Sequence, residues 1–382
     1  MYVYHKWCLG LMSILLIGLS GCVGPLSLQG SRDAYNMAVQ RTDNKELLLN
    51  LVRSRYSEPL QFLHIGAINT SFNYQASAGT QISLPVGGGL PDTYGVSGNL
   101  AYTEVPTITY QPLEGTQFAK QTQTEMPLDE LVLLARSGWA IDHLMRLVVE
   151  RIGTLRNVPS LPDYERFIEL VNIWRDIQRN GDFNFIRLIP AEFPLVTQND
   201  PELKKVTSSV LLLRIDYPSQ AVADKADAIL GIEPLHIKNP DDKIFVALRL
   251  IDPLDALIPP ARKKVITPLP IWLRSFESIL GYAALGVDVP SHNQHLVKGY
   301  TKPSGKPLNP RTALQDMIHI QSTQPEQTFL SVKYRGHTFY IDDSDHASKD
   351  TFRLLSILYA LQSDAASSIP LLTIPVGRAG GG

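Results

Sequence analysis

The stretch INTSFNYQASAGTQISLPVGGGLPDTYGVSGNLAY, from Ile68 to Tyr102, alternates apolar and polar residues over most of its length. It carries a single charged side chain, that of Asp92. Successive side chains of a β-strand point to opposite faces, so an alternating run predicts a strand with two chemically different faces. The glycine-rich segment of residues 86–92 separates two such runs. We therefore expect a long antiparallel hairpin over residues 67–113.

Even-numbered positions of both runs share one expected face, under a register in which Leu84 pairs with Tyr94. The apolar face comprises Phe72, Tyr74, Ala76, Ala78, Ile82, Leu84, Val96, Leu100 and Tyr102. The opposite face comprises the uncharged polar residues Asn73, Gln75, Ser77, Gln81, Ser97 and Asn99. Exposed strands of soluble proteins usually carry charges that protect their edges, and neither of these runs does. A soluble sheet can nevertheless alternate in this way when its apolar face packs on a core.

The N-terminus has the features of a secretory signal. Residues 7–19 are largely apolar and uncharged, and this segment is too short to span a bilayer. It ends in Leu19-Ser20-Gly21-Cys22. These four residues resemble the lipobox of bacterial lipoprotein precursors, a resemblance confined to the first 22 residues. It implies removal of residues 1–21 and acylation of Cys22, by which the chain would bind membrane lipid.

Cysteine usage agrees with this interpretation. The chain contains 2 cysteines, of which Cys8 lies in the segment expected to be removed. Val23 and Gly24 follow Cys22, and the resemblance implies that the absence of an aspartate there favours the outer membrane. We expect a lipid-anchored, mostly periplasmic protein. The 35 basic and 37 acidic residues leave a net charge of −2, which gives no indication of a nucleic-acid partner.

Helical periodicity dominates the sequence on either side of the hairpin. Residues 31–56 predict a helix with the apolar stripe Leu47, Leu48, Leu51 and Val52. Residues 127–153 predict a long helix that Gly138 divides, and residues 162–181 predict another. After residue 182 strands and helices alternate, including a helix over 269–285, a tight hairpin turn at Arg335-Gly336, a helix capped by Ser348 and a strand over 370–376.

These elements predict the α+β class, with an N-terminal helical region and a long amphipathic β-hairpin followed by an α+β domain. The expected segments are a signal peptide (1–21), a lipidated N-terminus and helix (22–66), the hairpin (67–113), a helical region (114–181), an α+β domain (182–376) and a flexible tail (377–382).

Candidate catalytic and metal-binding motifs are weak. His292 and His295 form an H-x-x-H pair, but a metal site needs further ligands. Asp342, Asp343 and Asp345 lack the glycine and the distant glutamate of a calcium loop, so helix capping explains them better. We expect no catalytic residue, no metal and no cofactor, and hence a protein that is not an enzyme.

Two hypotheses for the hairpin remain open. In the first, a homo-oligomer closes its hairpins into a shared barrel, with the even face toward lipid and the odd face toward a water-filled lumen. This arrangement is similar in architecture to barrel-forming outer-membrane lipoproteins such as the curli secretion channel, and implies export or transport. In the second, the protein is a periplasm-facing scaffold whose hairpin packs on, or docks to, other envelope proteins.

Overall fold

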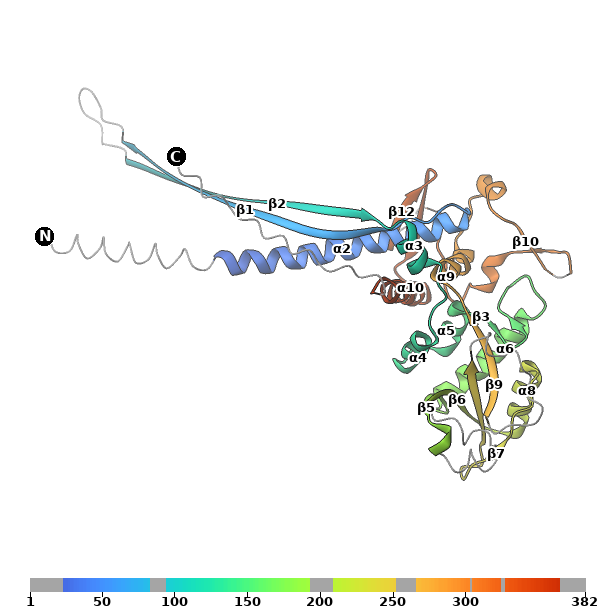
Figure 1. The fold of residues 1–382 in the computed structure, drawn as a ribbon. Coiled ribbons are helices and arrows are strands. Elements are labelled where there is room, and N and C mark those ends of the chain that lie inside the picture. The colour runs from blue at the N-terminus through green and yellow to red at the C-terminus, as the bar shows by residue number, and fades with distance from the viewer. Residues whose placement is uncertain are drawn as a thin grey trace, which may run out of the picture. The chain divides into compact units, whose positions relative to one another are not determined.

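The computed structural model describes residues 23–82, 94–192, 209–251, 266–302, 304–323 and 327–364 (Figure 1). The chain divides into two compact units. The body unit contains Met1–Leu60 and Lys120–Ala365, and the hairpin unit contains Gln61–Ala119 and Ala366–Gly382. The lipobox with Cys22, the turn between the long strands and the strand expected over 370–376 lie outside the described residues.

The described helices and strands establish the α+β class. The helices are α2 Val23–Arg55, α3 Gly115–Thr122, α4 Leu128–Arg136, α5 Ile141–Val148, α6 Tyr164–Arg179, α8 Gln220–Leu230, α9 Phe276–Ala283 and α10 His346–Asp364. Short 3₁₀ helices are η1 Pro190–Glu192, η4 Ala284–Gly286, η5 Ser291–Leu296 and η6 Pro310–Ala313.

The body unit is built around a mixed sheet. Its strands are β3 Val149–Ile152, β4 Leu155–Arg156, β5 Phe183–Leu188, β6 Val210–Tyr217, β7 Ile237–Lys238, β8 Ile244–Ile251 and β9 Ile266–Leu273. Their order is β4-β3-β9-β8-β6-β5, with β7 also paired to β8. Only the β8–β9 pair is parallel among these described strands. Sheet strands therefore come from both sides of residue 181.

Helix α6 covers this sheet through a regular apolar face. It packs against α5, α8 and the strands β4, β5 and β6. Its buried residues follow the three- and four-residue spacing of an amphipathic helix and are Phe167, Leu170, Val171, Trp174 and Ile177. The Trp174 indole N–H donates to the buried Tyr217 hydroxyl over 3.4 Å, which satisfies a polar group inside the core.

Helix α2 joins the body unit through the apolar stripe expected from its sequence. Leu47, Leu48, Leu51 and Val52 are all buried. The helix packs against β12, α9 and η4. It begins at Val23, earlier than the sequence pattern indicated, and ends at Arg55. Packing of the apolar stripe, rather than propensity, stabilises such a helix in a folded protein.

Two small hairpins complete the body unit. They consist of β10 Tyr300–Thr301 with β11 Pro307–Leu308, and β12 Thr328–Tyr334 with β13 His337–Asp342. Between β12 and β13, Arg335 and Gly336 have φ values of 48° and 79°. Two consecutive positive φ angles are typical of the tight type I′ turn, so the turn predicted at these residues is confirmed.

Three local expectations need correction. Gly138, with φ 92°, does separate α4 from α5, but residues 149–152 leave the helix and form β3. The first part of the helix expected over 269–285 is the end of β9, and only α9 is helical there. Both segments are short apolar runs, whose period alone does not separate a strand from a buried helix. Pairing of β9 with β3 and β8 decides in favour of strands.

The cap of α10 is Asp345 and not Ser348. The backbone N–H of Ser348 donates to Asp345 Oδ1 over 3.0 Å, and the Ser348 hydroxyl donates to Asp345 Oδ2 over 2.6 Å. The Ser348 hydroxyl also accepts from the backbone N–H of His319 at 2.7 Å. Ser348 therefore lies in the first turn of the helix, where it ties α10 to a neighbouring loop.

Candidate functional site

The hairpin unit is formed by two long antiparallel strands, β1 Leu63–Ile82 and β2 Tyr94–Pro112 (Figure 1). Its base is closed by a hydrogen bond of 2.9 Å from the Leu113 backbone N–H to the Phe62 carbonyl. The 20 residues of β1 correspond to roughly 65 Å of extended chain. The ribbon is thus much longer than the usual strand of a globular protein.

The register differs by two residues from the one assumed from the sequence. Tyr94 pairs with Ile82, not with Leu84, which lies outside the described residues. Tyr74 accordingly pairs with Tyr102, and Ala76 pairs with Leu100. Even positions still pair with even positions from Ile68 to Ile82, so the pairing keeps the parity on which the two expected faces depend. Alternation with a period of two specifies the parity of the pairing but does not distinguish registers that differ by two residues.

A β-bulge lies near the base of the ribbon. The register shifts between Ile65 and Ala67, so that Ile65 pairs with Tyr110 while Ile68 pairs with Ile108. An extra residue in one strand changes which parity points to a given face. It aligns the odd-numbered Leu63 and Ile65 with the even-numbered Ile108 and Tyr110. Leu63, Ile108 and Tyr110 are 38%, 38% and 46% exposed.

The outer edges of the ribbon have no strand partner among the described residues, because β1 and β2 form a sheet of two strands. Each strand therefore presents a row of backbone N–H and C=O groups on its outer side. Pro106 in β2 pairs with Thr70, and proline has no N–H to donate. Which face of the ribbon meets lipid, water or protein stays a prediction for all the positions named above.

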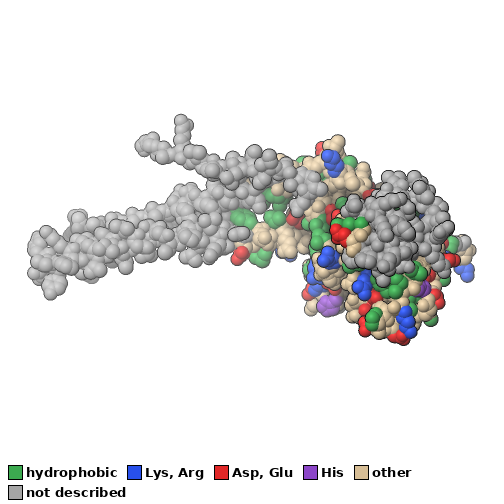
Figure 2. Space-filling model, turned by 60° about the horizontal axis from the view of Figure 1, so that its bottom comes forward, with side chains coloured by type: hydrophobic (Ala, Val, Ile, Leu, Met, Phe, Trp, Pro, Cys, Tyr) green, Lys and Arg blue, Asp and Glu red, His purple; other side chains and the backbone are tan. Residues whose placement is uncertain are grey.

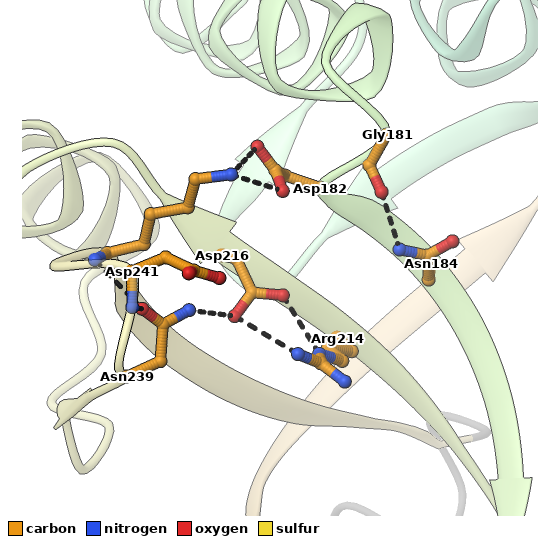
Figure 3. Close-up of polar contacts among 8 residues, drawn as sticks. Gly181, Asp182, Asn184, Arg214, Asp216, Asn239 and Asp241 are labelled. Carbon is orange, nitrogen blue, oxygen red and sulfur yellow. Dashed lines mark hydrogen bonds and ion pairs between the residues drawn. The ribbon is translucent and has the colours of Figure 1, made fainter.

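Figure 3 shows a polar cluster of the body unit that is held together by ion pairs and hydrogen bonds. Asp216 accepts from Arg214 Nε over 2.8 Å and from Asn239 Nδ2 over 3.3 Å. Nearby, Lys243 Nζ donates to both oxygens of Asp182 at 2.7 and 2.8 Å, and this contact raises the pKa of Lys243. Asp216 is thus paired with Arg214 and Asp182 with Lys243, and these contacts hold the loop before β8 on the sheet.

A second cluster surrounds the buried Arg274. Its guanidinium donates to the carbonyls of Arg146, Leu147 and Asn157 at 2.6 to 3.0 Å, and it stacks 4.1 Å from the Tyr282 ring. Burial lowers the pKa of Arg274 and raises that of Tyr282. Arginine satisfies the carbonyl groups at the end of α5, which explains why a charge is tolerated there.

The two histidines of the H-x-x-H motif do not contact each other in the described part of the chain, whereas the helix capping expected for the aspartate motif is found at Asp345. His292 lies against His337, with their Nε2 atoms 2.9 Å apart, and no contact joins it to His295 in the described structure. Asp342 accepts from Ser344, and Asp343 accepts from Lys349, while Asp345 caps α10. Within the described ranges, no group of three or more His, Cys, Asp or Glu residues could hold a metal ion.

The charged surface of the body unit is mixed. In Figure 2, Lys and Arg side chains are interspersed with Asp and Glu side chains over the described surface of that face. Among the described residues, none of the helices combines the length and the apolar character needed to cross a membrane.

One group was missed by reasoning from the sequence. Arg55 and Lys298 are distant in the chain, and neither lies in a recognisable motif, yet both line the same cavity beside η5. No sequence signal in a single chain could have joined them.

No protein-family model matches this chain, and neither a curated protein nor a solved structure is significantly similar to it.

Proposed function

We propose that this protein is a lipid-anchored subunit of the bacterial outer membrane. In this proposal, several copies pair their β1–β2 hairpins edge to edge and close a shared β-barrel pore for export or transport. The observation that carries the proposal is the long two-stranded ribbon, whose outer edges have no partner among the described residues.

The unpaired edges favour assembly between copies on physical grounds. A backbone group without a hydrogen bond in lipid costs several kcal/mol, so only helices and closed barrels span membranes. A hairpin of two strands is also marginally stable by itself in water. Pairing β1 of one copy with β2 of the next would satisfy both edges at once, and a ring of copies would leave no edge.

The uncharged part of the ribbon has the length that a barrel requires. Tyr74–Ile82 pairs with Tyr94–Tyr102, which is about nine paired positions per strand. A tilted membrane-spanning strand needs roughly 9–11 residues. Below this part, Glu104 pairs with Phe72. A carboxylate is costly in lipid, so we place the membrane boundary near Glu104 and the remainder of the ribbon in water.

Crosslinking between copies tests the pairing. Two differently tagged chains are coexpressed and oxidised. One chain carries Ser77→Cys in β1, and the other carries a single cysteine in β2, at Ser97, Asn99 or Ala101. The chain has only 2 native cysteines, Cys8 and Cys22, so new disulfides are readily assigned. We expect a disulfide between differently tagged chains for at least one β2 position, because neighbouring strands lie about 4.8 Å apart.

The matched control is Ser137→Cys, an exposed position in the body unit, which should give no such product. Absence of crosslinks at every β2 position, with monomeric particles in neutral detergent, would contradict the proposal.

The alternative is a scaffold whose hairpin docks on other envelope proteins. The exposed Leu63, Ile108 and Tyr110 at the base of the ribbon favour it, because apolar side chains gathered on one face often mark a protein contact. Planar-bilayer recordings separate the two functions. A scaffold gives no channels, whereas a pore gives channels whose ion selectivity changes with Ser77→Arg, since lumen substitutions tune selectivity.

A further inference from the structure

A cavity of about 620 Å³ lies in the body unit, at the C-terminal end of α2, between η4, η5 and the β10–β11 hairpin. Its volume falls in the usual range of small-molecule sites. Three cations line it, namely Arg55, Lys298 and Arg311, together with the carboxylate Asp288. The lining also includes the buried apolar residues Leu285 and Val287.

The single carboxylate of this lining is already neutralised. Arg311 NH1 donates to Asp288 Oδ1 over 2.7 Å. His319 Nε2 lies 3.2 Å from Asp288 Oδ2 on the other side. The charges of Asp288 and Arg311 therefore cancel. Both carboxylate oxygens of Asp288 already have a partner, Arg311 on one side and His319 on the other. The remaining charge of the cavity is that of Arg55 and Lys298.

Among the described residues, no acceptor hydrogen-bonds to the Arg55 guanidinium group. It is half-buried, and its Nε atom is buried without a hydrogen-bond partner. No ion pair within the described parts of the chain includes Arg55 or Lys298, and the latter only approaches the Tyr300 ring at 5.9 Å. Burial is the main influence on Arg55 and lowers its pKa. Taking part of a guanidinium out of water without an acceptor is costly, and the guanidinium group is well suited to bind carboxylate or phosphate.

We propose that this cavity binds an organic anion, in which a phosphate or carboxylate group meets Arg55 and Lys298 and an apolar body lies against Leu285 and Val287. The planar guanidinium presents parallel N–H groups that match the oxygens of such an anion, and lysine adds a point charge. An inorganic ion alone would leave the apolar wall unused. The site is in the body unit and does not depend on pairing of the hairpins.

The test uses full-length protein in neutral detergent and phenyl phosphate as the probe, with binding followed by calorimetry. We expect a dissociation constant below about 1 mM for the parent, and at least about tenfold weaker binding for Arg55→Gln. Lys333→Gln is the matched control, because it removes an exposed cation outside the cavity and should leave affinity within about twofold. Benzyl alcohol lacks the charge of the probe and inorganic phosphate lacks its apolar body. Both should bind more weakly than phenyl phosphate.

A second measurement separates binding from folding. Because Arg55 makes no hydrogen bond to the described part of the chain, Arg55→Gln should have an unchanged or raised melting temperature without ligand, whereas a structural arginine would lower it. The proposal is overturned if phenyl phosphate does not bind, if Arg55→Gln binds it as the parent does, or if benzyl alcohol binds equally well. If inorganic phosphate binds as tightly as phenyl phosphate, the inference that the ligand carries an apolar body is wrong.

Discussion

Gly286 shows how one residue sets the distance between two segments of the body unit. A Cβ atom at this position would lie 2.3 Å from the Ile318 carbonyl oxygen and 2.8 Å from Ile318 Cγ2. The close approach lets the Ile320 N–H donate to the Gly286 carbonyl over 3.0 Å and the Asp288 N–H donate to the Ile320 carbonyl over 2.8 Å. Gly286 thus positions Asp288 at the cavity wall.

We expect Gly286→Ala to lower the free energy of unfolding by about 3 kcal/mol, because the new methyl group meets backbone atoms that cannot rotate away. Chemical denaturation followed by circular dichroism measures the loss. Gly299→Ala is the control: it has open space around it and no positive φ, so the change there should stay within about 1 kcal/mol. A Gly286→Ala protein as stable as the parent would show that the segments around Gly286 and Ile318 can move apart without loss of stability.

At the scale of the element, the N-terminus of α10 depends on one carboxylate. Asp345 accepts the backbone N–H of Ser348, which would otherwise have no partner inside the helix. A negative charge at this end also interacts favourably with the helix dipole. Through the Ser348 hydroxyl, the same carboxylate is linked to the His319 backbone.

Asp345→Ala should destabilise the protein by about 1–2 kcal/mol, since it removes both the cap and the link to the neighbouring loop. Asp345→Asn keeps an acceptor and should lose about half as much or less. Asp350→Ala, which removes an exposed carboxylate within the same helix, should change stability by less than about 0.5 kcal/mol. Thermal unfolding of the three variants measures these losses of stability. Equal losses for Asp345→Ala and Asp350→Ala would show that Asp345 is not a stabilising cap of α10.

At the scale of the whole molecule, the expected lipid anchor decides where the hairpin can act. Acyl chains on Cys22 would hold Val23, the first residue of α2, at a bilayer surface. Each CH₂ group buried in the bilayer contributes about 0.8 kcal/mol, so several chains form a lasting anchor. Anchored copies would be confined to one surface, where edge-to-edge pairing of their hairpins becomes more favourable.

Cys22→Ser should abolish incorporation of radiolabelled palmitate and release the protein from the membrane fraction, because the acceptor thiol is lost. Cys8→Ser is the matched control, since Cys8 lies in the segment expected to be removed and its loss should leave labelling intact. Equal palmitate labelling of Cys22→Ser and the parent would disprove lipidation at this residue.

The sequence by itself determined the features that depend on local periodicity. It predicted the α+β class, the buried stripe of α2 around Leu48 and Leu51, and the turn at Arg335-Gly336. These follow from side-chain spacing and from the few residues that accept a positive φ. The tertiary structure alone decided the pairing of β3 with β9, the pairing of Ile82 with Tyr94, and the presence of Arg55 and Lys298 in the lining of one cavity. Such contacts join distant segments, and packing selects among partners that local patterns leave equivalent.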